Sequence, residues 1–358
     1  MRRRLVVFAL LHVVLLGACG APEPAPSRDV HAFYYAWYAT PEVDGRWEHW
    51  NHEVLLHEGE RPRYAPPAEI GANYYPEAGL YSSQDPATVD RHCRELRRAG
   101  CGVLVVSWWG PQDGGDAALP ALFTAAARHG LEIAFHIEPF QGRGAQTTRD
   151  ALAALLGRWG EHPALHRREG RPVCYVYDSY LTKPDEWSRL LRPDGDITIR
   201  STALDAVMIG LWVQAADGEA LVAGGFDGYY TYFATDGFTH GSTSANWPQL
   251  AAFAAEHDML YVPCVGPGYS DLRVRPWNTA NQRSREAGAT YDRQWQAALD
   301  VAPAIVGVTS FNEWHEGTQI EPAAPYASPD FTYEDYAPHP STWYLDRTRH
   351  WAARLDER

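Results

Sequence analysis

The sequence predicts an α/β protein, a single (β/α)8 barrel of the TIM type with a long aromatic-rich loop after its first strand. Eight short apolar runs alternate with amphipathic helical patterns between residues 30 and 358, which is typical of a parallel sheet covered on both faces. Polar residues follow several of these runs directly, where the active sites of such barrels lie. A doubly wound open sheet is the alternative, but the Gly-rich phosphate turn that it usually carries is missing.

The eight apolar runs are the expected strands. They cover residues 31–37, 101–109, 131–139, 172–178, 205–212, 225–233, 259–266 and 304–314. Helical spacing separates most of them and is clearest over 87–100, where Val89, Cys93 and Leu96 recur on one face. Further helices are expected over 116–130, 147–160, 246–258 and 290–302.

The connection after the first strand, residues 38–85, is unusually long. It is rich in Trp, Tyr, His and Pro and shows no helical period. Loops of this length inside a compact domain are generally functional. In a barrel this loop would lie at the C-terminal rim of the strands, so we expect it to border the active site.

The N-terminus carries the pattern of a bacterial lipoprotein signal. Arginines at positions 2–4 precede a short apolar stretch over 5–16, and Leu-Gly-Ala-Cys follows at 16–19. We therefore expect a signal peptide over 1–18, a lipid on Cys19, a Pro-rich tether over 19–29 and a catalytic domain over 30–358. The protein would then be exported and anchored to a membrane, at the periplasmic face or the cell surface. An ordinary signal peptide with a chance cysteine is the alternative.

The charge and the cysteines of the chain limit the kinds of partner and ligand that it can bind. The chain has 45 acidic against 31 basic residues and a formal charge of −14, which argues against nucleic acid. We expect a monomer that uses no cofactor. Cys93, Cys101, Cys174 and Cys264 have no zinc-site spacing, so no metal site is expected. Cys174 and Cys264 are expected as buried thiols, while a Cys93–Cys101 bridge stays open.

The chemistry is expected at the ends of the third and eighth strands. His136 and Glu138 end the third, and Glu313 and Glu316 follow Asn312 at the end of the eighth, with Glu321 a few residues further on. Two carboxyl groups among aromatic residues are the equipment of a glycosidase, which needs an acid and a base or nucleophile. Glu313 and Glu316 can act together only if the strand ends near Asn312, because residues three apart on a straight strand face opposite sides.

Two other mechanisms find less support. His315 could suggest a metal hydrolase, but the H-E-x-x-H spacing is absent. Ser310 could suggest a serine nucleophile, but no G-x-S-x-G surrounds it.

Six segments resemble glycoside hydrolase family 99, the endo-α-1,2-mannosidases. They are FYYAWY (33–38), SWWG (107–110), HIEPFQGR (136–143), FDGYYTYFATDGFTHGS (226–242), VGPGYSDLRVRPWNTANQR (265–283) and TSFNEWHEGTQIEP (309–322). The resemblance implies a metal-independent, retaining (β/α)8 enzyme that cleaves internal α-1,2-mannosidic bonds in mannan or N-glycan-type oligosaccharides through a 1,2-anhydro-sugar intermediate.

The resemblance also implies roles for single residues. Glu316 matches the general acid/base, and Glu313 matches the base that deprotonates the 2-hydroxyl of the sugar. The remaining matched positions are implied to bind substrate: Tyr35, Trp108, Trp109, His136, Glu138, Tyr230, Arg283 and Asn312. Phe140 stands where many members have Tyr, which removes one hydroxyl near Glu138 and bears on fine specificity.

Two other classes of protein are considered. A sugar-binding receptor of a transporter would be a two-lobed open-sheet fold and would need no acid pair. A weak or inactive family member acting as a surface glycan-binding lipoprotein would have lost one of the two acids, and both are present. Within the enzyme class, a glucosylated N-glycan arm and a fungal-type mannan branch both fit, and export favours mannan.

Overall fold

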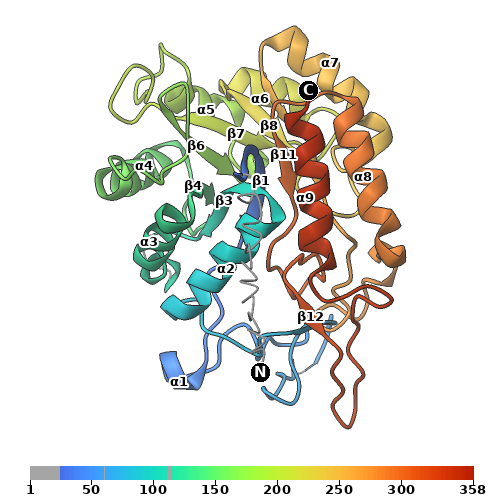
Figure 1. Cartoon of the computed structure of the whole chain (residues 1–358). Coiled ribbons are helices and arrows are strands. Elements are labelled where there is room, and N and C mark those ends of the chain that lie inside the picture. Colours follow the sequence, from blue (N-terminus) through green and yellow to red (C-terminus); the bar gives the residue numbers. More distant parts are fainter. Residues whose placement is uncertain (1–24, 60, 111–113) are drawn as a thin grey trace, which may run out of the picture.

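The computed structural model describes residues 25–59, 61–110 and 114–358, and its core is a parallel β-barrel (Figure 1). Nine strands form it, in the order β10-β11-β1-β3-β4-β6-β7-β8-β9. They are β1 (Ser27–Tyr34), β3 (Cys101–Trp108), β4 (Glu132–Ile137), β6 (Arg171–Val176), β7 (Val207–Leu211), β8 (Gly228–Tyr230), β9 (Leu260–Val262), β10 (Cys264–Val265) and β11 (Val306–Val308).

The barrel has eight strand positions, because β9 and β10 are two parts of one strand. Only Pro263 separates them; β9 pairs with β8 and β10 pairs with β11, all in parallel. Proline has no N–H to donate to a ladder, so the pairing is interrupted there. The predicted (β/α)8 barrel is confirmed, and the expected strand 259–266 is its seventh position.

Helices surround the barrel and follow most strands (Figure 1). The eight longest are α2 (Pro86–Ala99), α3 (Leu119–His129), α4 (Ala145–Trp159), α5 (Pro184–Leu191), α6 (Asp217–Gly224), α7 (Trp247–His257), α8 (Ala289–Asp300) and α9 (Trp343–Asp356). Short helical turns are α1 (Pro41–Asp44), η1 (Gly114–Ala117), η2 (Ser179–Leu181), η3 (Ser244–Asn246), η4 (Thr279–Asn281) and η5 (Glu286–Gly288). All five expected helices are present; α5, α6 and α9 were not among them.

Helix α2 shows how the sequence determines these elements. Asp85 caps its start by accepting a hydrogen bond from Ala87 N at 2.9 Å, which satisfies one of the free N–H groups of the first turn. Val89, Cys93 and Leu96 are buried, as their spacing predicts. Gly100 ends the helix at φ +76°, a conformation that a side chain would disfavour. Cys101 then starts β3 directly.

The first strand begins earlier than expected. Ser27 pairs with Cys101, and its N–H donates to Gly100 O at 2.9 Å. Residues 27–29, assigned to the tether from the sequence, therefore belong to the barrel. The strand extends to Ser27 although Pro-rich residues precede it, because its hydrogen bonds pair backbone groups that would otherwise be left unsatisfied. Cys19 and the signal segment 1–18 lie outside the described residues.

The long loop after β1 is tied to the segment that follows β11. Within it, β2 (Tyr75–Pro76) pairs antiparallel with β12 (Ala323–Ala324), and Figure 1 shows α1 and β12 at the same end of the molecule. A second small pairing, β5 (Arg167–Arg168) with β6, lies outside this region. The aromatic loop thus lies at the rim where the catalytic residues were expected.

The remaining cysteines are buried thiols. Cys93, Cys101, Cys174 and Cys264 are all free, so the prediction for Cys174 and Cys264 is confirmed and the Cys93–Cys101 bridge is not formed. Burial raises the pKa of each to about 12, which leaves them unreactive. Among the helices of the described ranges, none is long and apolar enough to cross a membrane.

Candidate active site

The two catalytic candidates lie on a tight turn after β11. The strand ends at Val308, and Ser310 N donates to Thr318 O at 2.9 Å, so the chain doubles back on itself. Inside this turn Gly317 N donates to Trp314 O at 3.2 Å, and Gly317 has φ +62°. The expected strand 304–314 is therefore shorter than predicted. It ends before Asn312, which is the condition for Glu313 and Glu316 to act together.

Glu313 is held from two sides. Its Oε1 accepts the N–H of His315 at 3.0 Å, and its own N–H donates to Ser310 Oγ at 2.8 Å. The side chain is buried. Burial first, and then the negative charge of Glu316, raises the pKa of Glu313 well above its ordinary value. The two carboxyl groups are thus close enough for each to influence the proton of the other.

Glu316 lies beside a buried polar group from the loop after β10. Arg275 Nη1 is 3.6 Å from Glu316 Oε1 and 3.0 Å from Asp271 Oδ2, and Tyr269 OH donates to Asp271 at 3.0 Å. Burial raises the pKa of Glu316 to about 7, with Arg275 lowering it and Asp271 raising it. A carboxyl group whose pKa lies near neutral suits a general acid.

Asn312 connects the catalytic turn to the end of β1. Its Oδ1 accepts from Tyr35 N at 2.8 Å, and its Nδ2 donates to Tyr35 O at 2.8 Å. The side chain is fully buried. In this structure Asn312 positions the turn, and its expected contact with substrate stays a prediction.

Tyr35 lies with the acids. Its hydroxyl is hydrogen-bonded to that of Tyr232, and the charges of Glu138, Glu313 and Glu316 all add to the effect of burial in raising its pKa. The structure therefore brings Tyr35 and three of the predicted acids into one electrostatic neighbourhood.

The end of β4 supplies Glu138 in a fixed orientation. Ser107 Oγ donates to Glu138 Oε1 at 2.8 Å, and His136 Nδ1 lies 3.0 Å from the same oxygen. His136 Nε2 is 2.7 Å from Tyr230 OH. His136 and Tyr230 are both buried and lie behind Glu138 in this chain of contacts, and their expected contact with substrate stays a prediction.

The two adjacent tryptophans play different parts. Trp108 is buried, and its Nε1 donates to Asp116 Oδ1 at 2.6 Å. Trp109 is 38% exposed. Both line a groove of about 830 Å³ together with Phe140. An exposed indole face of this kind can stack on the apolar face of a sugar ring.

The aromatic loop packs on the catalytic turn. Trp37 stacks on His49 with ring centres 4.4 Å apart, and the His52 ring is 4.7 Å from that of His315. Burial lowers the pKa of His49 to about 3 and that of His315 well below its ordinary value. These histidines are therefore neutral and do not add positive charge beside Glu313.

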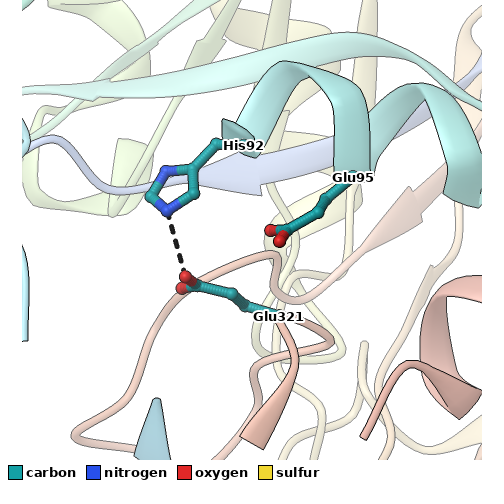
Figure 2. Close-up of side chains that lie close together, drawn as sticks. All are labelled: His92, Glu95 and Glu321. Atoms are coloured by element: carbon teal, nitrogen blue, oxygen red, sulfur yellow. Dashed lines mark hydrogen bonds and ion pairs between the residues drawn. The ribbon is translucent and has the colours of Figure 1, made fainter. Parts of the chain in front are cut away.

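Behind the turn, Glu321 is the centre of a buried polar network, and Figure 2 shows its contact with His92 and the nearby Glu95. Glu321 Oε2 accepts from Trp314 Nε1 at 2.9 Å and Tyr81 OH at 2.8 Å, and its Oε1 lies 3.0 Å from His92 Nε2. Burial alone would raise the pKa of Glu321, but His92 and Arg91 lower it below the ordinary value. The network fixes Trp314, the neighbour of Glu313.

His92, Glu95 and Glu321 have the spacing of a metal site, with ligand atoms within 4.8 Å of one another. The chain already supplies their partners, however. Arg91 Nη2 is 3.4 Å from Glu321 Oε1, and His92 Nδ1 is 2.9 Å from Tyr34 OH. Burial and the charge of Glu321 raise the pKa of Glu95 to about 8, and Arg91 Nε lies 3.7 Å from Glu95 Oε1. These three side chains are therefore better explained as a structural support for the turn than as ligands of a cation.

Comparison with known proteins agrees with this geometry. Residues 27–357 match the family described as glycosyl hydrolase family 99. The chain belongs to glycosyl hydrolase family 99. It is 42% identical over 346 residues to glycoprotein endo-alpha-1,2-mannosidase of Rattus norvegicus, across 92% of this chain and 75% of the relative. It is also 42% identical to the glycoprotein endo-alpha-1,2-mannosidase-like protein of Homo sapiens, across 92% and 77% of the two chains.

A solved structure of the family has the same fold. The GH99 endo-alpha-mannosidase from Bacteroides thetaiotaomicron superposes with a TM-score of 0.91 at 42% identity, covering 93% of this chain and 98% of that one. The resemblance seen in the sequence is confirmed, and this family 99 protein is a glycoside hydrolase.

The structure adds two residues to the site that the sequence analysis did not name, Arg275 and Tyr232. The guanidinium of Arg283 donates to the backbone oxygens of Asp236 at 3.0 Å and Gln282 at 2.8 Å, and its expected contact with substrate stays a prediction. Arg283 joins the loops after β8 and β10. The arginine beside Glu316 is Arg275, in the same segment 265–283. Tyr232 was also missed, although it lies in the matched segment 226–242.

Proposed function

We propose that the protein is a retaining, endo-acting α-1,2-mannosidase that cleaves internal bonds of mannan or N-glycan-type oligosaccharides. The observation that carries this proposal is the pair Glu313 and Glu316 on one turn, with the pKa of Glu316 raised to about 7. Relatives that share 42% of their residues with this chain are named glycoprotein endo-alpha-1,2-mannosidases, which supports the substrate class.

The two acids divide the work. Protonated Glu316 donates its proton to the departing glycosidic oxygen as the C1–O bond breaks, so the bond electrons and the proton leave together. The two coupled carboxyl groups share one proton in the reactive form, and it lies on Glu316. Ionised Glu313 then accepts the proton of the 2-hydroxyl, and O2 forms a bond to C1. This gives a 1,2-anhydro sugar and requires only a base, because the axial 2-hydroxyl of mannose already lies opposite an axial leaving group.

The second step reverses these roles. Glu316, now ionised, takes a proton from a water molecule that attacks C1, and the C1–O2 bond breaks. Glu313 returns its proton to O2. Two inversions at C1 give net retention, and both carboxyl groups end as they began.

The groups around the acids support binding of a neutral sugar. Tyr35 and Glu138 bring hydrogen-bonding groups next to the pair, and Trp109 offers an exposed ring face. Asn312, His136 and Tyr230 hold these groups in place.

We also propose that Cys19 carries a lipid and anchors the exported protein to a membrane, where external mannan is the favoured substrate. The pattern Leu-Gly-Ala-Cys at 16–19 and the Pro-rich stretch after it support this. A Cys19→Ser variant is expected in the soluble fraction after export. If it stays with the membrane pellet like the wild type, the lipid anchor is wrong.

Product analysis tests the activity. The enzyme is incubated with a glucosyl-capped and a mannosyl-capped oligosaccharide that share an internal α-1,2-mannosyl bond, and the products are identified by mass and by proton NMR. We expect a disaccharide from cleavage at that bond, released first as the α-anomer, with the mannosyl-capped substrate preferred. Binding without cleavage of either substrate would instead identify an inactive glycan-binding member.

A further inference from the structure

A tyrosine hydroxyl from the aromatic loop is bonded to the backbone on both sides of Glu313. Tyr38 OH donates to Asn312 O at 3.1 Å and accepts from Trp314 N at 3.1 Å. Trp314 N also donates to Asn312 O at 3.1 Å, so the hydroxyl closes a small ring of hydrogen bonds around the backbone of Glu313. The Tyr38 side chain is only 1% exposed, and it therefore acts on the reaction through Glu313 and not by touching the sugar.

The side chain and backbone of Tyr38 are themselves fixed by the loop. The ring stacks on Trp50 with centres 4.1 Å apart and meets the Tyr81 ring edge-on at 5.5 Å. Tyr38 N donates to Ser83 Oγ at 3.1 Å, and Tyr38 O accepts from Ser83 N at 2.8 Å. Residues 38 and 83 lie near the two ends of the loop, so these ends are joined where the hydroxyl meets the catalytic turn.

The orientation of the Glu313 carboxylate depends on the backbone that Tyr38 holds. Glu313 Oε1 accepts from His315 N, which is the next amide after Trp314 N. A shift of the Trp314 peptide therefore moves both the carboxylate and its hydrogen-bond donor. The negative charge of Glu313 adds to burial in raising the pKa of Tyr38 well above its ordinary value, so the hydroxyl stays protonated and can donate and accept at once.

The second acid is held by a different part of the chain. Glu316 O accepts from Ser270 N at 2.8 Å, and Arg275 Nη1 lies 3.6 Å from Glu316 Oε1. Both partners belong to the loop after β10. Loss of the Tyr38 hydroxyl is therefore expected to act on Glu313 and to leave the contacts of Glu316 in place.

We propose that Tyr38 is a positioning residue for the base Glu313 and aims its carboxylate at the 2-hydroxyl of the sugar. This inference rests on the proposed function, in which Glu313 accepts that proton. The long loop after β1 then does more than border the active site, because it carries the hydroxyl that holds the base. A misplacement of about 1 Å can lower the rate of an enzyme by about 10²-fold, so a single hydroxyl is enough to matter.

The variant Tyr38→Phe tests the proposal, since it removes only the hydroxyl. We expect kcat to fall by about 10–100-fold with KM little changed, the pattern of an interaction that matters only in the transition state. The loss is expected to be equal on a mannosyl–mannose bond and on an activated mannosyl fluoride, because the base acts whichever group leaves.

The control is Tyr291→Phe. The Tyr291 hydroxyl is also buried, and it is hydrogen-bonded to Thr348 Oγ1 at 2.9 Å between helices α8 and α9. Removing it is expected to leave kcat unchanged. The melting temperatures of both variants are measured, so that a loss of stability is seen separately from a loss of rate.

Double variants separate positioning of the base from a general loss of structure. In Glu313→Gln the base is absent, so adding Tyr38→Phe is expected to lower the residual rate no further. In Glu316→Gln, assayed on mannosyl fluoride, the same addition is expected to lower the rate by the full factor of about 10–100.

The outcomes distinguish this inference from the proposed function. If the wild type cleaves no mannoside, the proposed function is wrong. If the wild type is active and Tyr38→Phe keeps its kcat, or costs the same factor in Glu313→Gln, the hydroxyl does not position the base. A loss on the mannosyl–mannose bond alone would mean that Tyr38 acts on the acid Glu316, which also overturns the inference.

Discussion

Asn312 holds the backbone of Tyr35 with both ends of its amide. The Oδ1 accepts from Tyr35 N and the Nδ2 donates to Tyr35 O, each at 2.8 Å. The two residues are 277 positions apart and both buried. This pair fixes the end of the first strand against the turn that carries Glu313 and Glu316.

Removing that amide is expected to cost both stability and rate. Asn312→Ala leaves the N–H and C=O of Tyr35 buried without partners, at roughly 1–3 kcal/mol of unfolding free energy. Because Glu313 follows Asn312 directly, kcat is also expected to fall while the protein is still folded. The control is Asn246→Ala, which removes a partly buried hydrogen bond to His240 O at the end of the loop after β8 and is expected to leave kcat unchanged. If Asn312→Ala is destabilised but keeps the wild-type kcat, the Asn312 amide does not position the catalytic turn.

The pH profile reports the proton of Glu316. The acid must be protonated to act, and its protonated fraction falls as pH rises through a pKa of about 7. Hydrolysis of mannosyl–mannose bonds is therefore expected to decline on the alkaline side from near pH 7. A profile that stays flat to pH 9 would contradict the assignment of Glu316 as acid.

Arg275 sets the position of that decline. Its positive charge lowers the pKa of Glu316, so Arg275→Gln is expected to move the alkaline limb to higher pH. Arg283→Gln is the matched control, since Arg283 donates to backbone oxygens of Asp236 and Gln282. It is expected to leave the limb in place, whatever it does to KM. Equal shifts in both variants would mean that net charge, and not contact with Glu316, is responsible.

Much of the fold could be predicted because its signals are local. Each strand is an apolar run of a few residues. Gly100 and Gly130 end helices α2 and α3, and these helix ends can be recognised from the local sequence alone. Helices α5 and α6 have eight residues each, about two turns, which is too short for a clear period. The start of β1 was misjudged because pairing with β3, and not the composition of 27–29, decides it.

The site was predictable only in part, for the same reason. Glu313 and Glu316 share one segment, so their partnership is visible in the sequence. Segment 265–283, by contrast, contains several arginines whose roles depend on the path of the loop. Arg275 faces Glu316, while Arg283 turns toward a backbone oxygen of another loop. Spacing along the chain does not distinguish the two.

Glu321 is expected to matter for stability. Glu321→Gln removes the buried carboxylate that faces Arg91 and accepts hydrogen bonds from Tyr81 and Trp314, which is expected to lower the free energy of unfolding by roughly 1–3 kcal/mol at neutral pH. Glu286→Gln breaks an exposed pair with Arg293 and is expected to cost less than about 1 kcal/mol.

Acid titration distinguishes the charge from the shape of Glu321. The folded-state pKa of Glu321 is lowered, so its stabilisation is present above the ordinary pKa of a glutamate and is lost as pH falls through the lower, folded value. The difference in free energy of unfolding between wild type and Glu321→Gln, measured with denaturant, is therefore expected to become smaller at acid pH. If this difference does not change with pH, the loss of stability in Glu321→Gln comes from packing and not from charge.

The division of labour between Glu313 and Glu316 is the centre of this account, and one comparison of rates tests it. Glu316→Gln and Glu313→Gln are each assayed on a mannosyl–mannose bond and on an activated mannosyl fluoride. Loss of the acid is expected to lower the first rate by about 10²–10⁴-fold and to spare much of the second, since fluoride departs without a proton. Loss of the base is expected to lower both rates to that extent, and added azide is expected to rescue neither. The reversed pattern, or a glycosyl azide of inverted configuration from Glu313→Gln, would contradict the account.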